Sequence, residues 1–95
     1  MPFTLAATAR FLSQADHVPD DVYRQLQKQI RLLAQNPRHP SLKTHAVKNA
    51  IGSGGAKIFE GYVNMHYRFT WEYGENPSEI VLRNVDNHDE CLENP

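Results

Sequence analysis

The sequence has one cysteine, Cys91, among its 95 residues. A single cysteine excludes an internal disulfide and a zinc site built from several cysteines. No stretch approaches the roughly 20 consecutive apolar residues of a membrane-spanning helix, and the N-terminus lacks the basic and apolar segments of a secretion signal. Repeats, low-complexity tracts and long linkers are also missing. We therefore expect one domain, residues 1–95, that works in a reducing cytoplasm.

Acidic residues are missing from a long central segment, although the formal net charge of the chain is only -1. Between Asp21 and Glu60 the chain carries no acid and seven bases, namely Arg24, Lys28, Arg31, Arg38, Lys43, Lys48 and Lys57. From residue 72 onward the balance reverses. Such a segment can keep one surface positive whatever the total charge. Two interpretations stay open, a solvated helix face followed by basic loops or a surface that binds a polyanion.

The N-terminal half predicts a strand followed by two helices. Residues 3–7 are a candidate strand, and Thr8 is a candidate N-cap for a short helix to about residue 14. Pro19 and the two acids after it favour a second helix, which should end by Asn36 because Pro37 disfavours helical geometry before it. Its predicted buried stripe has 3.6-residue spacing and consists of Val22, Leu26, Ile30 and Leu33, widened by Tyr23 and Leu32.

The C-terminal half predicts strands, with a hairpin at residues 57–73 as its centre and its turn at 64–66. In the second hairpin strand, aromatic residues alternate with Arg68, Thr70 and Glu72, so one face should form the core and the other should be open to chemistry. The aromatics expected in the core are Tyr67, Phe69, Trp71 and Tyr73.

Further strands are expected at 44–48 and at 79–85, and the nearly continuous apolar run of the latter favours a central position. Short connections favour an antiparallel meander of the last three strands. The predicted fold class is therefore α+β, with two N-terminal helices packed on one face of a small, mainly antiparallel sheet of about four strands.

The histidines are the residues best suited to chemistry. No two of them have helical metal-site spacing and no cysteine joins them, so we expect no metal and no other cofactor. Metal-free RNA cleavage needs a base for the 2′-hydroxyl, an acid for the leaving 5′-oxygen and a cation for the phosphate. Histidine suits the first two roles and arginine the third, which makes candidates of His45, His66, Arg68 and His88. A competing interpretation pairs Arg68 with Glu60 across the hairpin.

Nearly the whole chain consists of short segments that together match one known family. They are Asn-Pro-Arg-His-Pro-Ser-Leu at 36–42, Lys-Thr-His-Ala-Val-Lys at 43–48, the glycine-rich turn at 52–55, Tyr-Arg-Phe at 67–69 and Val-Asp-Asn-His-Asp at 85–89. In this order and spacing they resemble the RelE/ParE superfamily of bacterial toxin–antitoxin toxins. The resemblance implies a strand–helix–helix–strands fold and a cognate antitoxin. In the histidine-using branch of RelE-like mRNA interferases it also implies ribosome-dependent mRNA cleavage without metal.

The resemblance also implies roles for single residues. Arg68 matches the strand arginine that contacts the scissile phosphate, His88 matches a C-terminal acid or base, and His45 matches a loop histidine before the glycine turn. Tyr62 and His66 stand where the same branch places further catalytic side chains of other identity. The expected RNA or ribosome contacts are Arg38, Lys43, Lys48 and Lys57.

Two positions differ from the family pattern. Asp86 stands where glycine is usual, and Leu92 stands where tyrosine or phenylalanine is frequent. Leucine cannot act as a phenol and stacks poorly on a base. Two alternatives to an mRNA-cleaving toxin therefore stay open: a non-catalytic or weakened relative that acts through protein binding, and a ParE-like inhibitor of DNA gyrase.

Overall fold

The computed structural model describes residues 2–93 and 95, and only the backbone of Asn49, Ser53 and Leu92. The difference noted at Leu92 therefore lies outside the described side chains. The elements are β1 (Thr4–Ala7), α1 (Ala9–Ala15), α2 (Asp20–Gln35), the 3₁₀ turn η1 (Pro40–Leu42), β2 (His45–Ile51), the 3₁₀ turn η2 (Ser53–Gly55), β3 (Lys57–Tyr62), β4 (Tyr67–Tyr73), β5 (Glu79–Asn87) and α3 (His88–Glu93).

The described strands form one five-stranded sheet in the order β1-β5-β4-β3-β2. β1 runs parallel to β5, and the other neighbouring strands are antiparallel. The α+β class and the internal position of β5 are confirmed. Each of the five strands overlaps a segment that was expected to be a strand, although the stated total was about four. β2 is an irregular edge strand, whose register with β3 shifts between Ala46 and Ile51.

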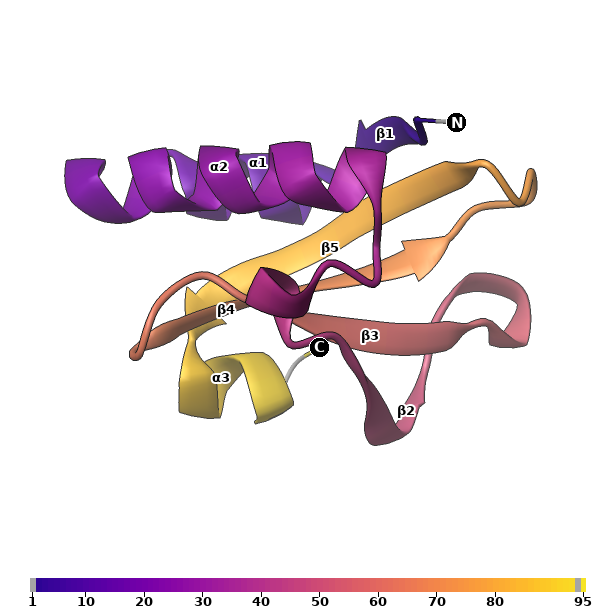
Figure 1. Ribbon diagram of the computed structural model, residues 1–95. Helices are drawn as coiled ribbons and strands as arrows, with labels where there is room; N and C mark the ends of the chain where they lie inside the picture. The colour runs from indigo at the N-terminus through magenta and orange to yellow at the C-terminus, as the bar shows by residue number, and fades with distance from the viewer. Residues whose placement is uncertain (1, 94) are drawn as a thin grey trace.

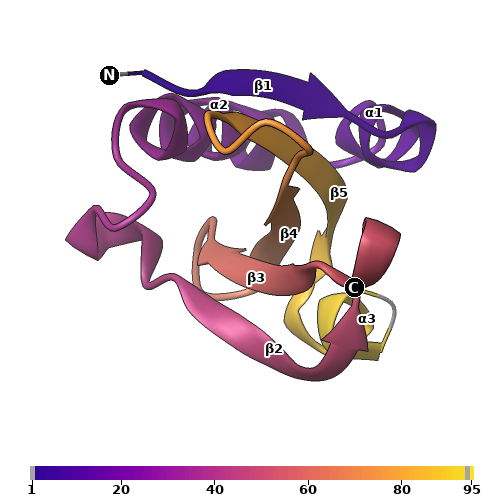
Figure 2. The same ribbon diagram turned by 90° about the vertical axis from the view of Figure 1, so that its right-hand side faces the viewer.

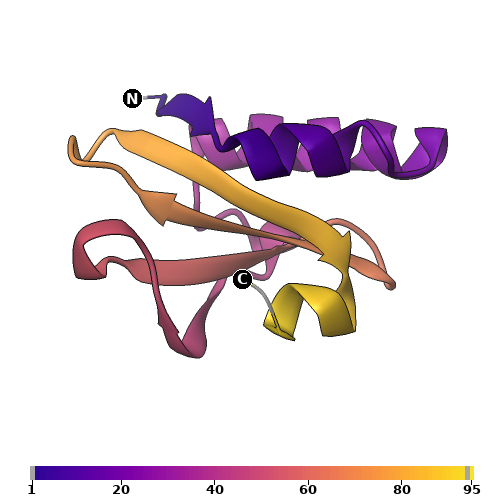
Figure 3. The ribbon, with the colours of Figure 1, turned by 180° about the vertical axis from the view of Figure 1, so that it is seen from behind.

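The helices lie on two sides of the molecule. Figures 1 and 3 show α1 and α2 together at one side and α3 at the opposite side, next to the C-terminal end. Figure 2 shows how the sheet curves from β1 at one end to β2 at the other. None of the described helices is long and apolar enough to cross a membrane.

Local side-chain chemistry explains where the elements begin and end. The Thr8 hydroxyl accepts a hydrogen bond from the Phe11 N–H and caps α1, as predicted. Helix α2 has Pro19 at its N-cap, acids in its first turn and Asn36 at its C-cap. In the hairpin turn, the Asn64 side-chain oxygen accepts from the N–H groups of His66 and Tyr67, which fixes the reversal between β3 and β4.

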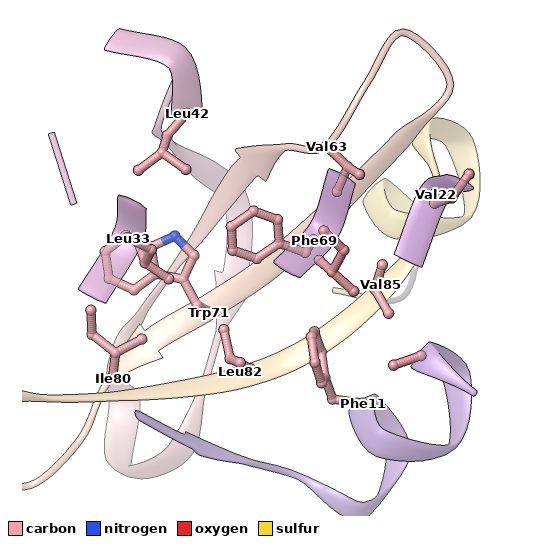
Figure 4. Close-up of a cluster of buried hydrophobic side chains, with 12 residues drawn as sticks. Phe11, Val22, Leu33, Leu42, Val63, Phe69, Trp71, Ile80, Leu82 and Val85 are labelled. Atoms are coloured by element: carbon pink, nitrogen blue, oxygen red, sulfur yellow. The ribbon is translucent and has the colours of Figure 1, made fainter. Parts of the chain in front are cut away.

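The hydrophobic core joins the two N-terminal helices to the sheet (Figure 4). Phe69 and Trp71 of β4 are buried there, as the hairpin pattern predicts. The prediction is wrong for Tyr73, which is 38% exposed. Tyr73 is the last residue of β4 and packs edge-on against Phe59 and Trp71, so part of its ring faces solvent.

The buried face of α2 differs from the predicted stripe at two positions. Val22, Leu26 and Leu33 are buried as expected, but Tyr23 is 40% exposed. Gln29 takes an inward position instead and is only 6% exposed. Its amide donates to the backbone oxygens of Ser41 and Tyr62, which satisfies a polar group that would otherwise be costly to bury.

The second face of the hairpin is not the open surface that the sequence suggested. Helix α3 contacts β4 and β5 on that side. Glu60, Thr70 and Glu72 are all buried there. The Glu72 carboxylate lies 2.6 Å from the Arg83 guanidinium, and the Thr70 hydroxyl donates to the Pro95 oxygen at 2.8 Å. The middle of this face is therefore covered, and hollows remain toward both ends of β4, one lined by Arg68 and the other by Glu72.

Candidate active site

A hollow of about 190 Å³ opens beside β3, β4 and the first turn of α3. Its lining residues are Lys43, His45, Glu60, Tyr62, Arg68 and His88. They come from the end of η1 and from β2, β3, β4 and α3, so only the tertiary fold brings them together. The hollow gathers four of the five predicted catalytic residues, together with Lys43 and Glu60.

The sheet register places several of these residues on one face. Tyr62 pairs with Arg68 across β3 and β4, and His45 pairs with Glu60 across β2 and β3. Residues directly opposite in antiparallel strands point to the same side. The Arg68 Cζ atom lies 4.6 Å from the centre of the Tyr62 ring, and the Lys43 Nζ atom lies 4.5 Å from it. Tyr62 therefore holds two cations by cation–π contact.

The proline-rich connector before β2 orients Lys43. This residue follows η1 with a left-handed backbone, φ 49° and ψ 40°, which non-glycine residues rarely adopt. The neighbouring backbone is held by two side chains: His39 Nδ1 accepts from the Ser41 N–H, and the Thr44 hydroxyl donates to the Pro37 oxygen at 2.8 Å. The strained turn directs the chain from η1 into β2 at the edge of the hollow.

Arg68 is held by the hairpin turn. Its Nη1 group donates to the backbone oxygens of Asn64 and Tyr67. The Cys91 thiol of α3 donates to the Arg68 backbone oxygen at 3.1 Å. Arg68 Nε lies 3.9 Å from Glu60 Oε1, so the pairing considered from the sequence exists as a close ionic contact and not as a hydrogen bond. The guanidinium is thus fixed at the wall of the hollow.

Glu60 is the residue of the hollow that was not among the predicted site residues. Its side chain is 1% exposed, and its Oε1 atom lies 3.3 Å from His45 Nε2. Among the described residues, its Oε2 atom has no hydrogen-bond partner. A charged residue is rarely buried to this degree unless it is paired. The sequence offered one sign of this role: Glu60 is the single acid among the mostly apolar residues 58–63 of the first hairpin strand.

The side chain of His88 lines the hollow, whereas that of His66 does not. His88 begins α3, and its Nδ1 atom lies 3.7 Å from an Asp89 carboxylate oxygen. His66 does not line the hollow. Its backbone oxygen instead accepts a hydrogen bond from the His88 N–H at 2.9 Å. His66 therefore helps to place His88 through the backbone, and its side chain is exposed.

The predicted RNA contacts divide into two groups. Arg38 and Lys43 line a second hollow of about 400 Å³, together with His39, Pro40 and Thr44. Lys43 lines both hollows, so the two are neighbours. Lys48 and Lys57 are exposed on β2 and β3 and line neither hollow.

The cysteine is a structural residue. Burial raises the pKa of the Cys91 thiol to about 12, so the group stays protonated at neutral pH. Its sulfur also accepts a hydrogen bond from the Asn84 amide at 3.4 Å. Within the described residues, no three histidine, cysteine, aspartate or glutamate side chains gather as they would around a metal ion.

The arrangement suits an anionic substrate. A guanidinium, a lysine and two imidazoles surround a small hollow, and one buried carboxylate lies in its wall. An arginine fork matches the geometry of a phosphate, and imidazoles transfer protons near neutral pH. Asp86 pairs with Arg68 in the β4–β5 ladder, but it does not line the hollow.

Matches to known proteins come from the comparison of structures and not from the comparisons of sequence. No protein-family model matches the sequence, and no curated protein matches it significantly. Solved structures do match over almost the full length. A chain of the archaeal RelE–RelB complex from Pyrococcus horikoshii OT3 is 12% identical and superposes with a TM-score of 0.71, covering 92% of this chain and 96% of that one.

Two further structures are similar. The YoeB/ParE toxin from Agrobacterium tumefaciens is 11% identical, with a TM-score of 0.69 and coverage of 90% of this chain and 99% of that one. The isolated E. coli RelE toxin is 14% identical, with a TM-score of 0.61 and coverage of 96% of both chains. The chain therefore has the RelE-like fold of the RelE/ParE toxin superfamily, as its sequence motifs predict.

Proposed function

We propose that this protein is the toxin of a toxin–antitoxin system and cleaves mRNA on the ribosome without a metal ion, in the cytoplasm. One observation carries the proposal: His45, Arg68 and His88, from three separate elements, meet at one hollow with Lys43 and Tyr62. The RelE-like fold supports it, because the similar structures are toxins.

In the proposed reaction, Arg68 binds the scissile phosphate through its planar fork. A base takes the 2′-hydroxyl proton, the 2′-oxygen forms a bond to phosphorus, the bond from phosphorus to the 5′-oxygen breaks, and an acid protonates that oxygen. His45, His88 and the Tyr62 hydroxyl are the groups at the hollow that can exchange protons at these two oxygens. Positive charge from Arg68 and Lys43 stabilises the negative charge that develops on the phosphate.

The proposed partners follow from exposed basic residues and from the matched structures. Arg38 and Lys43 extend the hollow along its rim, where the mRNA would continue, and exposed Lys48 and Lys57 are candidate ribosome contacts. The archaeal structure is a RelE–RelB complex. We therefore propose a cognate antitoxin protein as the second partner.

One observation favours a second candidate function. Asp86 lies directly opposite Arg68 in the sheet ladder, where its negative charge opposes phosphate binding. This arrangement fits a relative that keeps the fold and the protein partner and has weak or no nuclease activity. The ParE-like alternative, inhibition of DNA gyrase, needs no histidine cluster and is less consistent with the hollow.

The test is expression of the protein without an antitoxin, with the 5′ ends of mRNA mapped on translating ribosomes. Wild type should cleave within coding regions, and Arg68→Ala and His88→Ala should each lower cleavage by at least about tenfold, the minimum expected when a phosphate-binding or acid–base group is lost. His17→Ala removes an exposed histidine of the helical side and is the matched control. Intact mRNA in wild-type cells would contradict the nuclease proposal, and unchanged cleavage in both variants would contradict the site.

A further inference from the structure

A separate hollow of about 330 Å³ lies beside α2, next to the candidate active site. Tyr62 lines both this hollow and the one that contains Arg68, so the two are neighbours. Its other lining residues come from α2, from η1 and from the turn between β3 and β4, and none of them is acidic. We call it the amide hollow, because the side-chain amides of Gln25, Gln29 and Asn64 line it.

Backbone contacts fix how the Asn64 and Gln25 amides are turned. Asn64 Oδ1 accepts from the N–H groups of His66 and Tyr67, so its Nδ2 group is the donor, and it lies 2.7 Å from Gln25 Oε1. Gln25 Nε2 keeps two N–H donors, for which no partner occurs among the described residues. Because Gln25 is exposed, these donors are available to a molecule in the amide hollow.

Gln29 offers the opposite hydrogen-bonding group. Its Nε2 group donates to the backbone oxygens of Ser41 and Tyr62, which uses both amide hydrogens. Within the described part of the chain, its Oε1 atom accepts no hydrogen bond, although the side chain is only 6% exposed. An amide oxygen at this depth is costly unless a ligand or solvent donates to it. Gln25 and Gln29 are four residues apart on α2 and therefore share one face of the helix, where they place a donor beside an acceptor.

This donor–acceptor pair discriminates between kinds of ligand. A phosphate has only acceptor oxygens, so it would place a lone pair against the Gln29 oxygen. A nucleobase carries donors and acceptors along one edge, and glutamine and asparagine amides bind such edges. Lys28 lines the amide hollow, and Arg68 lies in the neighbouring one. The two cations favour an RNA strand, whose phosphate would lie in one hollow and whose base would lie in the other.

We propose that the amide hollow binds one nucleobase of the mRNA beside the scissile phosphate and makes cleavage depend on that base. Gln25 donates to an acceptor on the base edge, and Gln29 accepts from a donor on the same edge. The inference rests on the proposed function for its substrate, an RNA strand, but binding of the base does not require cleavage.

The structure supplies a matched pair of variants. Gln25→Glu keeps the Oε1 atom that accepts from Asn64, and it replaces the outward Nε2 donor with an acceptor oxygen. Gln27→Glu makes the same change of charge at an exposed position of α2 that does not line the amide hollow. A general effect of the added negative charge on RNA binding should be similar in both variants, whereas a changed ranking of the four bases should occur only in Gln25→Glu.

The first experiment measures binding in the full-length, ¹⁵N-labelled protein. The probes are four 2′-O-methyl trinucleotides, each with a single kind of base, because methylation removes the attacking hydroxyl. The side-chain amide signals of Gln25 and Gln29 should shift, and the dissociation constants of the tightest and weakest trinucleotides should differ by at least about fivefold, the lower end for a specific base contact. Inorganic phosphate should leave both signals in place. If no trinucleotide shifts the two signals, or if phosphate shifts them equally, the inference is overturned.

The second experiment compares the bases around the mRNA cleavage sites mapped on translating ribosomes. At one position beside the cut, Gln25→Glu should change the ratio between the most and least frequent base by at least about fivefold, and Gln27→Glu should not. The same base preference in wild type and both variants would refute the inference and leave the nuclease intact. A wild type that does not cleave, but whose Gln25 and Gln29 signals discriminate between the trinucleotides, would refute the nuclease and leave the inference intact.

Discussion

Gln29 allows a stability prediction that follows from the structure and not from the sequence pattern. Its amide nitrogen donates at 3.0 Å to the Ser41 oxygen and at 2.7 Å to the Tyr62 oxygen. These bonds connect α2 to η1 and to the end of β3, the two places that carry Lys43 and Tyr62 into the hollow. Gln29→Leu keeps a side chain of similar size and removes both bonds.

The expected loss is about 2 kcal/mol of unfolding free energy, from two hydrogen bonds of about 1 kcal/mol each. For a domain of this size that corresponds to a melting temperature lower by about 8–16 °C. Urea unfolding can be followed through Trp71, the single tryptophan, which is 1% exposed. The control is Gln27→Leu, because Gln27 lies exposed on the same helix.

The control should change the unfolding free energy by less than about 0.5 kcal/mol, as surface substitutions usually do. If Gln29→Leu were as stable as Gln27→Leu, the two hydrogen bonds would not stabilise the fold, and the reasoning would be refuted. If both variants lost the same unfolding free energy, the cause would be the leucine in the helix and not the missing hydrogen bonds.

Two further predictions concern packing and pH. A Cβ atom at Gly61 would lie 2.5 Å from Cζ of Phe69, so Gly61→Ala should destabilise the protein by about 1–3 kcal/mol in urea. Gly61→Ala should cost less unfolding free energy in a Phe69→Leu protein, because the ring that causes the clash is then gone. An equal cost in the wild-type and Phe69→Leu proteins would contradict the clash. Because the folded state holds the pKa of Cys91 at about 12, alkali should favour the unfolded chain, which releases the thiol proton earlier. Between pH 8 and pH 10, wild type should lose about 1–2 kcal/mol more unfolding free energy than Cys91→Ala; equal losses would contradict this.

The candidate site could be predicted only in part. The residues chosen for their own chemistry, His45, Arg68 and His88, do reach one hollow. Glu60 was missed because its burial depends on distant parts of the chain that cover the second face of the hairpin. His66 was included because it stands beside the hairpin strand in the sequence, yet in the structure it contributes its backbone oxygen to His88.

The sequence by itself determined the local structure of this protein. Thr8, Pro19, Asn36 and Asn64 act on backbone groups within a few residues, so the helix ends and the hairpin turn follow from neighbours in the chain. The RelE-like motifs also indicated the fold class. Only the tertiary structure decided which polar groups are buried and which side chains meet. These outcomes depend on contacts between residues far apart in the sequence, as when Gln29 reaches Tyr62 or the Glu72 carboxylate meets Arg83.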